Sequence, residues 1–210
     1  MGKVKAWQRG GNGSSKRALS RRVSIKDERP RILIVCEGEK TEPNYFRGFH
    51  LTSVVLKVEP AGAQHITVVE QAIAIQESDG DYSEVWCVFD RDKHINGGDK
   101  QVFNEALALA KRNGIEVAYS NDAFELWYLL HFAYYDTAMH RSDYIVKLDQ
   151  LLPKGYAKND PKIYEYLFDK MDSAIKRAKK LHKQWPDNQP EKEDPSTTVY
   201  RLVERLRSLV

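Results

Sequence analysis

Two cysteines in 210 residues are too few for a disulfide framework, and Cys36 and Cys87 both fall inside apolar runs. Small core thiols of a reducing compartment fit this pattern better than a disulfide or a metal pair. No apolar run approaches the roughly 20 residues that a bilayer span requires. The basic N-terminus lacks the apolar core of a signal peptide. The sequence therefore predicts a cytoplasmic protein that does not act at a membrane.

Motifs of several common enzyme classes are also missing. The sequence contains neither a G-x-x-x-x-G-K-[ST] phosphate-binding loop nor a G-x-S-x-G nucleophile motif. Its six histidines form no H-x-x-H pair, and there is no C-x-x-C pair. These absences argue against a P-loop NTPase, an α/β-hydrolase and a zinc site.

Positive charge is concentrated at the N-terminus. Residues 1–31 hold ten of the 33 Lys and Arg residues but two of the 30 acids, a balance of +8 that leaves −5 for the remainder. Gly and Ser are frequent there and apolar residues are few, which predicts a disordered basic arm over residues 1–30. Such an arm either adds sequence-independent affinity for nucleic acid or is a solvated tail. The residues that would contact phosphates are Lys3, Lys5, Arg9, Lys16, Arg17, Arg21 and Arg22.

Beyond the arm, strand and helix patterns alternate. Apolar runs predict strands at 32–36, 54–58, 85–89 and 115–119. Helical spacing of apolar residues predicts helices at 43–50, 67–78, 100–113 and 124–135. Strands separated by helices indicate parallel βαβ units, so an α/β core with a parallel sheet flanked by helices is expected over 31–140.

The C-terminal part of the chain reads as wholly helical from about residue 143. Asp160-Pro161 and Asp194-Pro195 each place an acid before a proline, which is typical of a helix start. Helices are therefore expected over about 161–184 and 195–209. Together they predict a helical extension, residues 141–210, packed on the core.

Acidic residues follow two of the predicted strands directly. Glu37 comes after the strand at 32–36, and Asp90 and Asp92 come after the strand at 85–89. Ligands of parallel sheets bind outside the carboxyl ends of the strands, so these carboxylates are expected to share one crevice. Several carboxylates repel one another unless a cation lies among them, and Mg²⁺ prefers one or two carboxylates with waters and phosphates. The pattern predicts metal-assisted chemistry on phosphates, with Glu37, Asp90 and Asp92 as ligands of Mg²⁺ or Mn²⁺.

A glutamate at one strand end and a D-x-D pair at another resemble the Toprim domain, in which such residues hold magnesium for phosphodiester chemistry. Three further segments resemble a single family more specifically. Residues 32–46 (ILIVCEGEKTEPNYF), 120–127 (SNDAFELW) and 195–200 (PSTTVY) look like signatures of the RloB family of restriction-linked, phage-defence proteins. The resemblance begins near residue 31 and leaves the basic arm outside. It implies a Toprim-like fold, and members are often encoded near ATPases or restriction-modification genes.

Three positions leave alternatives open. Many Toprim domains carry an acid four residues after the first glutamate, where this chain has Thr41; Glu42 could substitute. Lys40 could neutralise a phosphate or transition-state charge, or pair with neighbouring acids at the surface. Glu125 could face the metal crevice as a catalytic residue, as the family signature suggests, or close a capping box with Asp122.

Aromatic residues on the predicted helix at 124–135 have a simpler interpretation. Trp127, Tyr128, His131 and Phe132 recur at helical spacing, which favours core packing over base stacking. The C-terminal basic run, residues 176–183, favours a solvated helix face over a nucleic-acid surface.

Together these features predict a magnesium-dependent phosphodiesterase or nuclease of phage defence, acting on DNA or RNA. Glu37, Lys40 and Glu125 would be its catalytic residues. The alternative is a non-catalytic nucleic-acid-binding subunit that works with a partner ATPase or restriction-modification subunit. A glycosyltransferase that uses D-x-D ranks below both, because it does not explain Glu37.

Overall fold

The structure is a computed structural model that describes residues 2, 29–92, 100–185 and 189–210. The seven basic residues predicted to contact nucleic acid lie outside the described residues. The proposed boundaries of arm, core and extension stay predictions.

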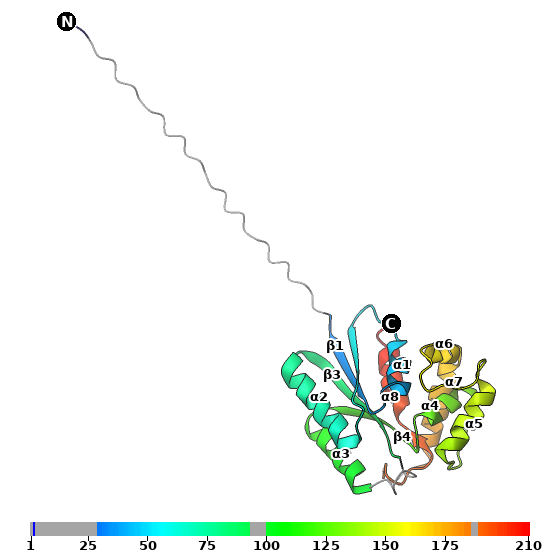
Figure 1. Ribbon diagram of the computed structural model, residues 1–210. Coiled ribbons are helices and arrows are strands. Elements are labelled where there is room, and N and C mark those ends of the chain that lie inside the picture. The colour runs from blue at the N-terminus through cyan, green and yellow to red at the C-terminus, as the bar shows by residue number, and fades with distance from the viewer. Residues whose placement is uncertain (1, 3–28, 93–99, 186–188) are drawn as a thin grey trace.

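Five strands form one sheet within the described residues (Figure 1). In spatial order they are β2 (Val55–Pro60), β1 (Arg31–Cys36), β3 (Tyr82–Asp90), β4 (Glu116–Asn121) and β5 (Ser196–Thr197). β1 to β4 are parallel, and β5 runs antiparallel to β4. The expected α/β class is confirmed, whereas the finer Toprim-like assignment stays a prediction.

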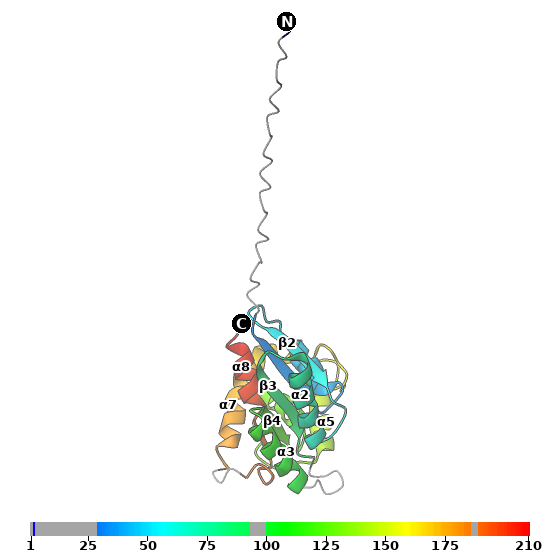
Figure 2. The same cartoon turned by 90° about the vertical axis from the view of Figure 1, so that its left-hand side faces the viewer.

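Helices cover both faces of the sheet (Figures 1 and 2). One face carries α2 (His65–Asp79) and α3 (Lys100–Arg112). The other carries α1 (Thr41–Arg47), α4 (Glu125–Phe132), α7 (Met171–His182) and α8 (Val199–Arg207). On that side α5 (Arg141–Leu151) packs against α4, and α6 (Ile163–Leu167) packs against α1.

The residues of β1 alternate between two hydrophobic clusters, one on each face of the sheet. Leu33 and Val35 pack in the cluster that includes α2 and α3, whereas Ile32, Ile34 and Cys36 belong to the larger cluster on the opposite face. A strand that is covered on both faces needs an apolar side chain at every position, which explains the continuous apolar run.

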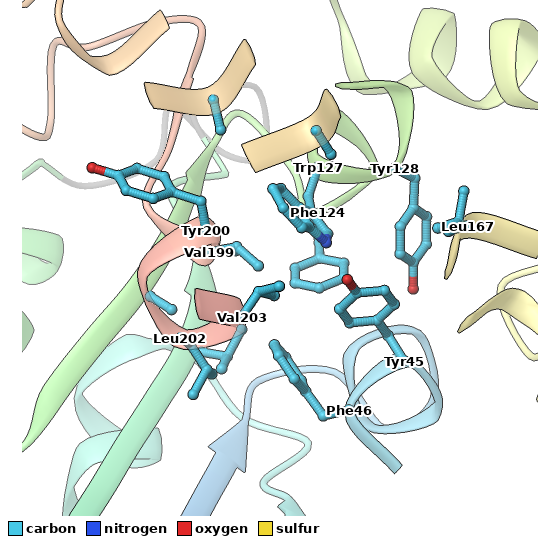
Figure 3. Packing of buried hydrophobic residues seen from close by; sticks show 14 of the residues in the cluster. Tyr45, Phe46, Phe124, Trp127, Tyr128, Leu167, Val199, Tyr200, Leu202 and Val203 are labelled. Carbon is cyan, nitrogen blue, oxygen red and sulfur yellow. The ribbon is translucent and has the colours of Figure 1, made fainter. Parts of the chain in front are cut away.

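The larger cluster joins segments that are distant in the sequence. Figure 3 shows Tyr45 and Phe46 of α1, Trp127 of α4 and Val203 of α8 pointing toward a common centre. Trp127, Tyr128 and His131 are almost completely buried, which confirms the prediction of core packing. The His131 ring lies 2.9 Å from the Trp127 carbonyl, and burial lowers the pKa of His131 to about 3, so this imidazole is neutral.

Two C-terminal predictions are wrong. The segment after Asp194-Pro195 begins as β5 and not as a helix, because Ser196 and Thr197 pair with the end of β4. The helix predicted over 161–184 is interrupted by a 3₁₀ turn, Phe168–Lys170, between α6 and α7. In the remainder of the fold, the ends of the predicted elements differ from the observed ones by a few residues.

Candidate functional site

A small cavity of about 160 Å³ lies at the carboxyl ends of β1 and β3, beside the first residues of α1 and α4. Its walls include five carboxylates and two cations from segments that lie between residues 37 and 158. The lining residues are Glu37, Gly38, Thr41, Glu42, Asp90, Asp92, Phe124, Glu125, Arg141 and Lys158. Glu37, Asp90 and Asp92, the acids that follow the two strands, therefore line one cavity, the acidic cavity.

Glu37 connects the ends of two neighbouring strands. Its backbone N–H donates to the Val88 carbonyl at 2.8 Å, and its carboxylate accepts a hydrogen bond from the Asp90 backbone N–H at 2.8 Å. Burial raises the pKa of Glu37 to about 8; the Asp90 hydrogen bond opposes this shift, and the Asp92 and Glu42 charges add to it. Near neutral pH this carboxyl group can therefore hold or release a proton.

Asp90 and Asp92 line the cavity together, and the residue between them points elsewhere. The Arg91 side chain is fully buried, with its guanidinium 5.6 Å from the centre of the Phe103 ring. A His65 ring nitrogen lies 2.6 Å from the Asp90 carbonyl oxygen and so ties the start of α2 to the end of β3. Burial raises the pKa of both aspartates, and the Glu42 and Glu37 charges raise that of Asp90 further.

Glu42 faces the acidic cavity next to Thr41. It belongs to the first turn of α1, is only 5% exposed and lines the cavity beside Glu37. A Cβ atom at Gly38 would collide with the Glu42 carboxylate, so glycine is needed there for this close approach. Burial raises the pKa of Glu42 to about 7.

Glu125 faces the acidic cavity. It is the first residue of α4, is 2% exposed and accepts a hydrogen bond from the Tyr156 hydroxyl at 2.9 Å. The N-cap residue of α4 is Phe124, without a side-chain cap, and not Asp122 as the capping-box alternative required. Whether Glu125 is catalytic stays a prediction, as do the other site roles.

The basic residues at the cavity are not the one that the sequence suggested, Lys40. Lys40 is exposed and is not among the lining residues, whereas Arg141 of α5 and Lys158 are. Arg141 Nη1 lies 2.7 Å from Asp92 Oδ1, and its Nη2 lies 4.0 Å from Asp90 Oδ2. Sequence reasoning missed Arg141, Lys158 and Tyr156, since no motif distinguishes them from the many other basic and aromatic residues of the chain.

The donor set of the cavity suits a hard divalent cation. Asp90 Oδ1 is buried and has no hydrogen-bond partner among the described residues, and carboxylate oxygens are the ligands that Mg²⁺ and Mn²⁺ prefer. As the side chains stand, however, no group of three or more His, Cys, Asp or Glu residues in the described segments is arranged to hold a metal ion.

The fold and the cavity define an α/β protein with buried acids at the carboxyl edge of a mainly parallel sheet. A family model described as RloB-like protein matches residues 32–206. The chain therefore belongs to the RloB-like family, and the predicted arm lies outside the match. No curated protein and no solved structure matched this chain. None of the helices in the described segments has the length and apolar character needed to cross a membrane.

Proposed function

We propose that this protein is a divalent-metal-dependent phosphodiesterase that cleaves nucleic acid, and that it acts in phage defence. The observation that carries the proposal is the convergence of Glu37, Glu42, Asp90, Asp92 and Glu125 in one small cavity. Burying so many carboxylates together is unfavourable for folding, as the raised pKa values of Glu37, Glu42 and Asp90 show. Functional sites are where such arrangements concentrate, because a bound cation or a transferred proton makes use of them.

Each group at the cavity has a role in this proposal. Asp90, Asp92 and Glu37 would hold Mg²⁺ or Mn²⁺, which supplies an activated water and spreads the charge of the phosphate. With its raised pKa, Glu37 can also exchange a proton with the attacking or leaving oxygen. Arg141 and Lys158, which line the cavity, would contact phosphate oxygens.

Metal titration by calorimetry tests the proposal. Mn²⁺ is titrated into the wild type and into the Asp90→Asn/Asp92→Asn variant, which keeps the shape of both side chains but removes their charges. We expect binding to the wild type and at least about tenfold weaker binding to the variant. The matched control is Glu70→Gln/Glu77→Gln, which removes two charges from α2 far from the cavity lining. Equal binding to wild type and site variant would remove the metal site.

Cleavage is measured next, with labelled single-stranded DNA, duplex DNA and RNA in the presence of Mg²⁺ or Mn²⁺. The wild type should cleave at least one of them, and Glu37→Gln should not. Metal binding without cleavage of any nucleic acid would contradict the enzymatic proposal and leave the metal site intact.

A second candidate function is a non-catalytic nucleic-acid-binding subunit that works with a partner ATPase. The observation that favours it is the ion pair of Arg141 with Asp92, which neutralises part of the acidic cavity without any metal. In that case Glu37→Gln should leave biological protection against phage unchanged.

A further inference from the structure

A second and larger cavity lies between α1 and α6. Its volume is about 550 Å³, which is in the range of cavities that bind small ligands. Its lining residues are Asn44, Arg47, Gly48, His50, Pro161, Tyr164, Glu165 and Phe168. None of them belongs to the lining of the acidic cavity.

The two cavities are nevertheless close to each other, because α1 and the segment 158–161 contribute residues to both linings. Thr41 and Lys158 line the acidic cavity, and Asn44 and Pro161, each three residues further along, line the α1–α6 cavity. A helix rises about 1.5 Å per residue, so Thr41 and Arg47 are separated by about 9 Å along α1. Stacked nucleotides advance about 3.4 Å each, so a strand whose phosphate lies at the acidic cavity reaches the second cavity within about three nucleotides.

The walls of the α1–α6 cavity suit a nucleobase. Phe168 is 57% exposed, although a large aromatic side chain gains free energy from burial, and its ring centre lies 5.7 Å from that of Tyr164. Tyr164 is held in place by Phe49, with ring centres 4.7 Å apart. A Cβ atom at Gly48 would collide with Tyr164, so this glycine lets the ring lie directly against α1.

Arg47 adds a cation at the same cavity. It is exposed, and one guanidinium nitrogen donates to the Val58 carbonyl at 3.2 Å. Aromatic rings beside a cation are the arrangement by which proteins bind single strands, with bases stacked on the rings and phosphates on the cation.

We propose that the α1–α6 cavity binds a nucleobase of a single-stranded segment that flanks the phosphate at the acidic cavity. Phe168 stacks on the base, Tyr164 supports it, and Arg47 contacts the adjoining phosphate. The occupant is a single strand, since both faces of a base inside a duplex are already covered by its neighbours. This inference rests on the proposed function, because continuity with the acidic cavity selects nucleic acid as the occupant.

Binding of labelled ten-nucleotide single strands, measured by fluorescence anisotropy in EDTA, tests the inference without metal. The full chain is used at moderate salt, at which non-specific phosphate contacts are weakened. We expect Phe168→Ala to weaken binding about fivefold or more, as is typical for removal of a base-stacking ring. Arg47→Gln should weaken it as well. Matched controls are Val146→Ala, which truncates an apolar residue of equal exposure on α5, and Arg112→Gln on α3.

An abasic strand of equal length separates stacking from charge. The effect of Phe168→Ala should disappear with this ligand, whereas the effect of Arg47→Gln should persist. DNA and RNA strands are compared to identify which of them the cavity prefers.

Unchanged binding in Phe168→Ala would overturn the inference and would be the result expected if a partner protein occupied the cavity. Tighter binding of duplex than of single strands would overturn it too. The proposed function fails separately: if Phe168→Ala weakens strand binding but the wild type cleaves nothing, the base site stands and the phosphodiesterase does not.

Discussion

Arg141 places a positive charge among the acids of the acidic cavity. Its guanidinium is 22% exposed and pairs with Asp92, which is 15% exposed, so this ion pair is partly shielded from solvent. A metal ion that binds Asp90 and Asp92 must compete with it. In the proposed function, Arg141 would then contact the phosphate.

Replacing Arg141 by Gln should therefore strengthen metal binding in the absence of nucleic acid. We expect a gain of about fivefold in Mn²⁺ affinity, which corresponds to removal of a competing ion pair worth about 1 kcal/mol. Calorimetry measures the affinity, and Arg112→Gln is the control for removal of a surface charge. Weaker Mn²⁺ binding in Arg141→Gln would show that Arg141 supports the metal site and does not compete with it.

Glu42 should make the stability of the metal-free protein depend on pH. Its pKa is raised from the ordinary 4.5 to about 7, so between these values the folded state binds more protons than the unfolded state. The free energy of unfolding should therefore fall as pH rises through this window, and the contribution is complete below it. In the variant Glu42→Gln, in which this side chain stays neutral, the free energy of unfolding should fall less between pH 4.5 and pH 7.5 than in the wild type. We expect the two falls to differ by about 1–3 kcal/mol.

Urea unfolding in EDTA at the two pH values measures this difference. Glu70→Gln is the control, because Glu70 is exposed on α2. An equal difference in the free energy of unfolding between the two pH values, in wild type and in Glu42→Gln, would mean that the pKa of Glu42 is the same in the folded and the unfolded protein.

At the scale of elements, β5 joins two segments that are far apart in the sequence. Ser120 pairs with Thr197, and Asn121 pairs with Ser196, so the segment 195–200 lies against the segment 120–127. The Thr198 hydroxyl oxygen accepts a hydrogen bond from the Tyr119 N–H at 2.9 Å, and the Thr198 N–H donates to the Tyr119 carbonyl at 2.8 Å. This pairing holds the end of β4 in place immediately before α4 and Glu125.

Thr198→Val should destabilise the protein by about 1–3 kcal/mol, because it leaves the buried Tyr119 N–H without its hydrogen bond. Valine keeps the shape of threonine, so little of this effect would come from packing. Chemical denaturation measures the change, with Thr52→Val at the surface as the control. A change below about 0.5 kcal/mol, the size typical of a surface substitution, would show that β5 is held by other contacts.

At the scale of the whole molecule, positive charge is concentrated in the N-terminal segment, which lies mostly outside the described residues. The prediction at this scale is that this basic segment adds affinity for nucleic acid. Deletion of residues 1–28 should leave the fold intact, because this Gly- and Ser-rich segment holds few apolar residues that could be buried. It should weaken binding to all nucleic acids alike. The salt dependence on duplex DNA should also become flatter, by roughly 0.9 log units for each phosphate that the arm neutralises in the full chain.

Binding curves at several salt concentrations test this prediction. The shortened chain and the full chain are compared on one duplex and one single strand. Equal slopes in both would show that the basic segment is a solvated tail.

Local patterns of the sequence determined the class of fold and the acids of the site. The apolar runs that end in Glu37 and in Asp90-Arg91-Asp92 predicted two buried parallel strands. Because parallel strands end at the same edge of a sheet, their acids had to meet. Periodicity also assigned Trp127 and Tyr128 to the core. These inferences hold because each depends on residues that are adjacent in the sequence.

Only the tertiary structure decided which other groups complete the cavity. Arg141, Lys158 and Tyr156 come from the C-terminal part of the chain, and their places depend on how that part packs on the α/β core. The two-residue strand β5 was missed for the same reason, since its pairing with β4 joins residues 77 positions apart. Long-range packing and pairing leave no local pattern in the sequence, whereas a strand buried on both faces leaves a continuous apolar run.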